Sequence, residues 1–550
     1  GRCRAGQIAP ADNRGRMKIL SLISVLALTT LGGCGPTDGN TDASPAGSAP
    51  NVILLMADDM GWAQTSYYGH PILKTPNLDA MASSGLRMDR FYAGAPSCTP
   101  TRASVLTGRT NDRTGAFRVG QSINKQEKML STAFQNAGYA TAHFGKWHLN
   151  YSGVGLEHPL EADDPHNPGE LGFSFWLSHT SGFDFFESAG GTFELSRMGQ
   201  RETFRGDGSE VIVNEALQFI SDQVQRDKPV FVVIWYSSPH GPWKATAEDV
   251  APFLGQVDRT SANMHGEIVA MDRSIGALRR GLRDLGIADN TLVWFTSDNG
   301  GSADIDTGVT YPDGKDRPPV IEYPSDCSDS VDPNLTSEES VALGCIRGAK
   351  PDSTGHLRGF KKDFYEGGLR VPTLVEWPAA IKPRVTNFPS ATYDIFPTLI
   401  DVAKLDPDSI NPVYDGMSIV DVFHSDPPRR DKPLGFRASD GRMWMDNDWK
   451  LVQNVSFTTR GFVTEPLELF NIIGDPSEEQ DLINVYPARA LQMQRELEKW
   501  SVSVSRSALG ADYPEGYVLP TGRKFDAVVD ERRERRFAEW AEEIRLANSE

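Results

Sequence analysis

NVILLMADD, residues 51–59, is the stretch that decides the fold, because an unbroken apolar run here ends in two aspartates. Two later runs have the same form: residues 229–236 are followed by SSPHG, and residues 291–296 are followed by SDNG. Strands without polar alternation are typical of a parallel sheet that helices cover on both faces. Helical periodicity lies between the runs, at residues 77–85, 130–137, 211–226 and 265–285. This alternation predicts an α/β fold with a large, mostly parallel sheet sandwiched by helices.

The pattern changes near residue 430. Residues 442–452 and 468–473 have the pattern of short antiparallel strands, and residues 488–502 that of an amphipathic helix. We therefore expect a smaller C-terminal α+β subdomain that carries a short antiparallel sheet. A charged helix, expected to be a solvated surface helix, follows from residue 526. The predicted division is a main domain at 51–429, the C-terminal subdomain at 430–505 and a C-terminal extension at 506–550.

The N-terminal segment has the form of an export signal. A basic start at Met17 precedes an apolar run at 19–28, which is too short to span a bilayer, and then the tetrapeptide LGGC ending at Cys34. LGGC resembles the lipobox of bacterial lipoproteins, in which the cysteine is lipidated; an ordinary signal peptide with an incidental cysteine is the alternative. We expect residues 1–34 to be an upstream stretch and lipoprotein signal peptide, and residues 35–50 a flexible tether. The protein would be an exported bacterial lipoprotein, periplasmic or outer-membrane associated.

The charge and the cysteines restrict the partners. The net charge is −19, which argues against nucleic acid and leaves a lipid at Cys34 as the only expected membrane attachment. An anionic substrate would therefore need a local cluster of cations. Cys327 and Cys345 lie in one Pro- and Asp-rich stretch, residues 302–356, and could close a loop in an oxidising compartment. Cys98 is then the cysteine without an expected disulfide partner.

Polar residues follow all three apolar runs, at the sheet edge where open α/β folds bind ligands. Asp58-Asp59 and Asp298-Asn299 supply the hard oxygen ligands that Ca²⁺ or Mg²⁺ prefers. Either pair alone is better explained as a helix cap or turn former. His240, just after the second run, is by itself more typical of a hydrogen-bonded structural histidine.

Three further motifs carry reactive residue types. CTPTR, residues 98–102, puts a cysteine at a predicted loop-to-helix junction with an arginine one turn later. That arrangement is consistent with an activated thiolate or with a buried structural cysteine. GKWH, residues 145–148, flanks an aromatic with a cation and an imidazole, and LRGFK at 357–361 continues to EGGLRVP at 366–372.

In combination these motifs resemble the formylglycine-dependent sulfatases (type I, arylsulfatase-like) of the alkaline phosphatase superfamily. CTPTR matches the C-x-P-x-R signature, whose cysteine a formylglycine-generating maturation enzyme oxidises to 3-oxoalanine (formylglycine). SVLTGR at 104–109, TPNLD at 75–79, GKWH, SDNG and the 357–372 stretch also match, in the family's order, over roughly residues 50–505. The resemblance implies an alkaline phosphatase-like fold with a catalytic sulfatase domain at 51–429.

The resemblance also implies site residues. A divalent metal, Ca²⁺ in preference to Mg²⁺, would be bound by Asp58, Asp59, Cys98, Asp298 and Asn299. The sulfate group would lie among the catalytic residues Cys98, Arg102, Lys146, His148, His240 and Lys361. Phe360 and Lys362 stand where many relatives have small residues, so the pocket there differs in shape.

The implied chemistry explains why Cys98 would be modified. Cations neutralise the sulfuryl oxygens while one hydroxyl of the formylglycine hydrate attacks sulfur. His240 would protonate the leaving alcohol, and His148 would assist the second hydroxyl in expelling sulfate. A plain thiol or hydroxyl has no such second group.

The expected reaction is hydrolysis of sulfate monoesters, with carbohydrate or polysaccharide sulfates favoured over aryl sulfates because an exported enzyme meets sulfated glycans. Two alternatives stay open. One is a phosphate or phosphonate monoester hydrolase of the same superfamily. The other is a non-catalytic binder of sulfated glycans, which would require the loss of a catalytic position, whereas the cysteine, the metal ligands and both lysines are present.

Overall fold

The computed structural model describes residues 49–150, 158–183, 191–257, 259–302, 353–438, 441–458, 461–518 and 527–549. The expected signal peptide with Cys34, residues 35–48 of the tether, and both Cys327 and Cys345 lie outside the described residues. Within the described ranges, no helix is both long and apolar enough to cross a membrane.

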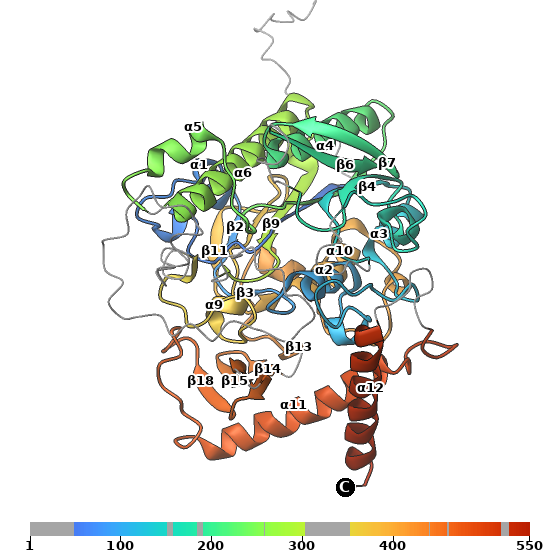
Figure 1. Cartoon of the computed structure of the whole chain (residues 1–550), viewed down its shortest axis with the longest axis vertical. Helices are drawn as coiled ribbons and strands as arrows, with labels where there is room; N and C mark the ends of the chain where they lie inside the picture. Colours follow the sequence, from blue (N-terminus) through green and yellow to red (C-terminus); the bar gives the residue numbers. More distant parts are fainter. Residues whose placement is uncertain are drawn as a thin grey trace, which may run out of the picture. The chain divides into compact units, whose positions relative to one another are not determined.

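A ten-stranded sheet forms the centre of the main domain (Figure 1). Its middle strands are the three apolar runs: β9 (Thr291–Ser297), β1 (Asn51–Ala57) and β8 (Val230–Trp235). Strand β1 pairs in parallel with both β8 and β9, and β4 (Ala140–Lys146) pairs in parallel with the other edge of β8. The strand order is β11-β2-β10-β9-β1-β8-β4-β5-β6-β7. The predicted large, mostly parallel sheet is therefore confirmed.

The outer strands make the sheet mixed. On one side β10 (Leu374–Glu376) runs antiparallel to β9 and to β2 (Leu86–Met88), and β11 (Arg384–Thr386) pairs with β2 in parallel. On the other side β5 (Phe175–His179) is parallel to β4, whereas β6 (Thr192–Arg197) and β7 (Gln200–Arg205) form an antiparallel edge. A separate two-stranded sheet joins β3 (Phe91–Tyr92) to β12 (Ser390–Ala391).

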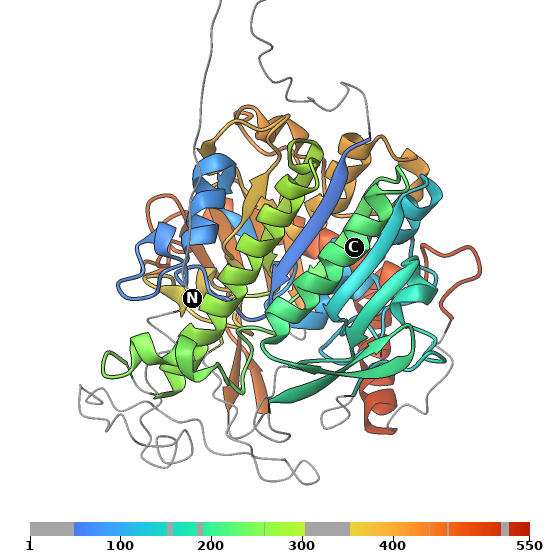
Figure 2. The same cartoon turned by 90° about the horizontal axis from the view of Figure 1, so that it is seen from above.

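Helices cover both faces of the sheet (Figure 2). The alternation of β1 side chains divides the core in two. Ile53 and Leu55 pack in one cluster with apolar residues of α1 (Pro76–Ser84), α4 (Gly208–Val224) and α6 (Arg259–Asp284). Val52 and Leu54 pack in the other with residues of α2 (Cys98–Thr107), α3 (Leu130–Asn136) and α10 (Ile395–Ala403). The short helices α5 (Ala247–Val250) and α9 (Glu366–Leu369) lie between these elements in sequence.

The C-terminal region carries the expected short antiparallel sheet, of strands β13 (Leu434–Ala438), β14 (Gly441–Asp446), β15 (Trp449–Gln453) and β18 (Glu468–Asn471). A hairpin of β16 (Val455–Thr458) and β17 (Gly461–Thr464) precedes β18. Helix α11 (Pro487–Ala508) packs Met493 and Leu497 against Trp444 and Leu451 of this sheet. The domain boundaries at 429 and 505 stay predictions.

The charged C-terminal helix differs from expectation. It forms as α12 (Ala527–Ala547), but it is not fully solvated, because Trp540 is 4% exposed and packs against Phe117. Arg437 of β13 lies over the Trp540 ring and 3.5 Å from Glu543. One apolar contact, Trp540 with Phe117, and one ionic contact, Glu543 with Arg437, therefore hold this helix against the rest of the domain despite its polar composition.

A buried ionic cluster joins the small sheet to the main domain. The ammonium of Lys450 on β15 donates to Glu366 Oε1 at 2.9 Å and lies 2.8 Å from Glu478 Oε1. The Tyr92 hydroxyl donates to the other Glu366 oxygen at 3.0 Å. Burial raises the pKa of Glu478 to about 7, against the attraction of Lys450. Both carboxylates therefore share Lys450, and Glu366 has a second cation, Arg370, at 3.7 Å.

Replacing Lys450 with Met should lower the free energy of unfolding by about 3–5 kcal/mol, because two buried carboxylates lose the cation that they share. The triple variant Lys450→Met/Glu366→Gln/Glu478→Gln removes all three charges and should recover most of that loss. Urea unfolding measures both variants. A single variant as stable as the parent would contradict this role of the cluster.

Candidate active site

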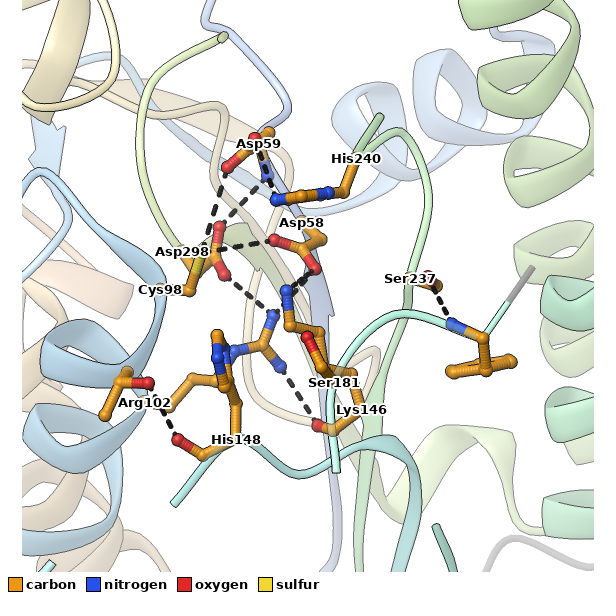
Figure 3. Close-up of polar contacts among 12 residues, drawn as sticks. Asp58, Asp59, Cys98, Arg102, Lys146, His148, Ser181, Ser237, His240 and Asp298 are labelled. Carbon is orange, nitrogen blue, oxygen red and sulfur yellow. Dashed lines mark hydrogen bonds and ion pairs between the residues drawn. The ribbon is translucent and has the colours of Figure 1, made fainter. Parts of the chain in front are cut away.

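The carboxyl ends of the central strands bring the predicted polar residues together (Figure 3). Two aspartates directly follow β1, the Asp-Asn pair follows β9, and His240 lies a few residues beyond β8. Cys98 is the first residue of α2. All ten residues expected from the sequence gather at this edge: Asp58, Asp59, Cys98, Arg102, Lys146, His148, His240, Asp298, Asn299 and Lys361.

The acidic residues surround the cysteine. Cys98 Sγ lies 3.6 Å from Asp58 Oδ1 and 4.0 Å from Asp59 Oδ1. The Asn299 amide donates to Asp59 Oδ1 at 2.7 Å, and the Asp59 backbone N–H donates to Asp298 Oδ1 at 3.0 Å. All five residues are buried. The two acidic pairs, 240 residues apart in sequence, therefore form one unit.

This donor set fits a hard divalent cation. Ligand atoms of Asp58, Asp59, Cys98 and His240 lie within 4.8 Å of one another. The side-chain carbonyl oxygen of Asn299 is buried and accepts no hydrogen bond from any part of the chain that the structure describes. Buried carboxylates this close together repel one another unless cations balance them. Carboxylate and amide oxygens of this kind are ligands for Ca²⁺ or Mg²⁺.

Three cations line the other side of the cluster. Arg102 donates to Asp298 Oδ2 at 2.7 Å and to the backbone carbonyl of Lys146 at 3.1 Å. The Lys146 ammonium donates to the carboxylate of Asp58. Lys361 Nζ donates to Asp59 Oδ2 at 2.7 Å and lies 3.2 Å from His240 Nε2. Each cation thus contacts one of the carboxylates beside Cys98, so an anion bound by the cations would lie next to the metal ligands.

Burial controls the protonation states. It raises the pKa of the Cys98 thiol well above its usual range, so the unmodified cysteine is not the activated thiolate that its position allowed. Burial, with Lys146 and Arg102 nearby, lowers the pKa of His148 well below its usual range. Burial and then Lys361 lower the pKa of His240 to about 4. Both histidines are therefore neutral at pH 7 in this arrangement.

The pKa values of two carboxylates in the site are shifted in opposite directions. Burial opposes the ionisation of Asp59, but Lys361 and His240 together hold its pKa well below the usual range. Burial, followed by the charge of Asp58, raises the pKa of Asp298 to about 6 despite the contact with Arg102. A bound divalent cation would favour the ionised form of both.

Two backbone features hold the site in shape, and one of them, the Thr99 contact, has no signal in the sequence. The Thr99 hydroxyl donates to the backbone carbonyl of His148 at 2.8 Å and accepts from the Gly120 N–H at 3.2 Å. His148 has a φ of 57°, in the left-handed region, so this bond supports a strained residue. Gly145 has a φ of 95°, and a Cβ there would lie 2.0 Å from the Trp235 carbonyl oxygen. Nothing in the CTPTR motif signals the Thr99 contact, which depends on the folded loop.

Comparisons with known proteins agree with this geometry. Residues 50–405 match the family model "Sulfatase". The chain belongs to the sulfatase family. It is 29% identical over 452 residues to N-acetylgalactosamine-6-sulfatase of Canis lupus familiaris, covering 77% of this chain and 73% of that protein. The predicted class of enzyme, a sulfuric ester hydrolase, is thereby confirmed.

Solved structures confirm the fold. The crystal structure of Ps i-CgsB in complex with k-i-k-neocarrahexaose matches with a TM-score of 0.65 at 24% identity, covering 82% of this chain and 93% of that one. The phosphonate monoester hydrolase of Agrobacterium radiobacter matches with a TM-score of 0.54 at 18% identity, covering 86% and 100%. This alkaline phosphatase-like fold is also that of a phosphonate monoester hydrolase, so the site residues rather than the fold decide which ester is cleaved.

Replacing Asp298 with Asn tests the metal ligands, because it keeps the shape and an acceptor for Arg102 but removes one charge. We expect the parent to hold about one divalent ion per chain, and the variant to hold clearly less and to lose most of its kcat. Elemental analysis after dialysis measures the content. Asp426→Asn, an equal charge change at an exposed carboxylate, is the control and should behave as the parent. Equal metal content and activity in Asp298→Asn and the control would rule out the assignment.

Proposed function

We propose that the protein hydrolyses sulfate monoesters of sugars or polysaccharides, using residue 98 as formylglycine together with a divalent metal, Ca²⁺ in preference to Mg²⁺. The observation that carries this proposal is the buried position of Cys98 between two acidic pairs and three cations in a sulfatase family member. A formylglycine-generating enzyme would mature the residue.

The charge balance of the cluster supports an anionic substrate. The carboxylates of Asp58, Asp59 and Asp298 face three cations, so the side chains alone are close to neutral. A divalent metal held by the two acidic pairs and residue 98 would add two positive charges and withdraw electron density from the sulfuryl oxygens. The site would then be cationic enough to hold a sulfate monoester, which carries one negative charge.

Hydrated formylglycine would supply two hydroxyls on one carbon, one to attack sulfur and one to release the sulfate. The side chains around residue 98 bind the sulfate group of the substrate and transfer the protons that the reaction requires. Arg102, Lys146 and Lys361 bind the sulfuryl oxygens, and all three are buried, which strengthens each interaction. His148 is neutral and its Nδ1 has no hydrogen-bond partner among the described residues, so it can accept the proton of the second hydroxyl.

His240 is oriented to serve the leaving group. Its Nδ1 lies 2.6 Å from the Gly241 carbonyl and must donate to it, which leaves Nε2 facing Lys361 and the cluster. A bound sulfate anion beside Lys361 offsets that lysine's charge and so favours a proton on Nε2. That proton can pass to the alcohol as the ester bond breaks.

A carbohydrate substrate is favoured by the relatives. One is named for N-acetylgalactosamine 6-sulfate hydrolysis, and one structural neighbour was crystallised with k-i-k-neocarrahexaose. Every catalytic position expected of a sulfatase is present in this chain, which argues against a non-catalytic binder. The remaining competitor, a phosphate or phosphonate monoesterase, is separated by kinetics on matched esters.

His240→Asn should lower kcat/KM for an alkyl or sugar sulfate by about 10²–10⁴-fold, because the alcohol then leaves without a proton. The same variant should lose much less activity on 4-nitrophenyl sulfate, since nitrophenolate leaves readily unprotonated. Steady-state kinetics on the two esters measures this difference. Equal losses on both would show that His240 has no acid role.

Cys98→Ser should stop after at most one turnover, because the single hydroxyl is consumed when the sulfate ester forms. We expect a slow burst of alcohol no larger than the enzyme concentration, and an intact mass increased by one sulfuryl group (SO₃) carried on the serine oxygen. Mass spectrometry of the resting variant confirms that the serine is unmodified. Sustained turnover by such a serine variant would exclude the hydrate mechanism.

We also propose that the protein is exported and held to a membrane through a lipid at Cys34. The support is the LGGC sequence after a short apolar run, followed by a polar segment. Cys34→Ala should move the enzyme from the membrane to the soluble fraction, because the body is acidic and would have no other anchor. A variant that still sediments with membranes would place the anchor elsewhere.

A further inference from the structure

A hollow of about 650 Å³ lies at the end of the sheet away from the active site. Its walls include the first residues of β4 and β5, Ala140 and Phe175, and the C-terminal half of α4. Lys146 is six residues further along β4, and a strand rises about 3.3 Å per residue, so about 20 Å separates the hollow from the catalytic cluster. A volume of this size is typical of sites for small ligands.

The hollow has an apolar wall and an unused polar group. The rings of Phe175 and Phe219 stack with centroids 5.4 Å apart, and the Arg197 guanidinium lies 5.8 Å from the Phe175 ring centre. Tyr139 is 6% exposed, and its hydroxyl is buried without a hydrogen-bond partner anywhere in the described ranges. A buried hydroxyl left unpaired costs stability, and a ligand that bonds to it removes that cost.

The rim supplies positive charge. Arg226 and Lys228 line the hollow and are exposed, and their side chains make no ion pair or hydrogen bond with the residues that the structure describes. Arg197 differs, because Glu202 and Glu215 neutralise it at 2.8 and 3.0 Å. Asp222 and Glu215 also line the hollow, so three cations there face two carboxylates, and Asp222 accepts from the Gln218 amide. In a chain of net charge −19, this local excess of positive charge, carried by Arg226 and Lys228, favours an anionic ligand.

We propose that this hollow is a second, non-catalytic binding site for a sulfated saccharide. Arg226 and Lys228 would bind a sulfate group, and the Phe219 ring, supported by Phe175 behind it, would pack against the apolar face of a sugar ring. Tyr139 and the amides of Gln135 and Gln223 would bond to sugar hydroxyls. The sulfated class of the ligand rests on the proposed function. A polymer held here would raise the local concentration of sulfate esters near the active site.

The test measures binding without turnover. In the full-length, metal-loaded protein carrying Cys98→Ala, a short dextran sulfate oligosaccharide is titrated by calorimetry, with unsulfated dextran of equal length beside it. We expect two classes of site for the sulfated probe, and Arg226→Glu/Lys228→Glu should remove one of them. Tyr139→Phe should weaken that same class about three- to tenfold, the loss typical of one hydrogen bond. Arg495→Glu/Lys499→Glu, an equal charge change on exposed residues of α11, should keep both.

Activity separates this proposal from the catalytic one. With Cys98 intact, Arg226→Glu/Lys228→Glu should hydrolyse 4-nitrophenyl sulfate as the parent does, while its KM for a long sulfated polysaccharide rises. A parent that fails to hydrolyse any sulfate ester would overturn the proposed function but leave the calorimetric result standing. The second site is overturned if Arg226→Glu/Lys228→Glu binds the probe as well as the α11 control, or if unsulfated dextran binds equally well.

Discussion

The parallel alignment of β1, β8 and β9 is the constraint on which the rest of the site depends. Because the three strands end at the same edge, Asp58, Asp59 and Asp298 are buried together, and repulsion among them must be balanced. Arg102, Lys146 and Lys361 supply part of that balance from other elements of the domain. In the proposed function, the same neutralisation that permits burial would let a metal cation and a sulfate ester bind side by side.

Burial also decides what the reactive groups can do. A thiol in this position is protonated, so Cys98 is a poor nucleophile as it stands, which fits a proposed role that begins with its modification. In the proposed mechanism the neutral His148 would accept a proton, and His240 would donate one once an anion offsets Lys361. The hydrophobic core beneath the strands makes these shifts, because it excludes water from the ends of β1 and β9.

The sequence predicts the centre of the fold better than its edges. The unbroken apolar runs identify β1, β8 and β9, since only strands buried on both faces tolerate such composition. The antiparallel edge of β6 and β7 carries polar residues on its exposed side and has no comparable signal. Helix α6 begins at Arg259, before the apolar periodicity starts. Its first turns are mainly polar, so the periodicity could not reveal where the helix begins. The anchors of α12, Trp540 and Glu543, pair with residues far away in sequence and need the folded chain.

Within the site, motif order predicts which residues meet but not how they touch. The contact between Lys361 and His240 spans 121 residues, and the Thr99 bond to His148 depends on a left-handed backbone. The most direct test of the central claim compares kcat/KM for 4-nitrophenyl sulfate and 4-nitrophenyl phosphate, using metal-loaded enzyme whose formylglycine content is verified by mass spectrometry. We expect a clear preference for the sulfate ester. A preference for the phosphate ester, or no turnover of the sulfate, would contradict it.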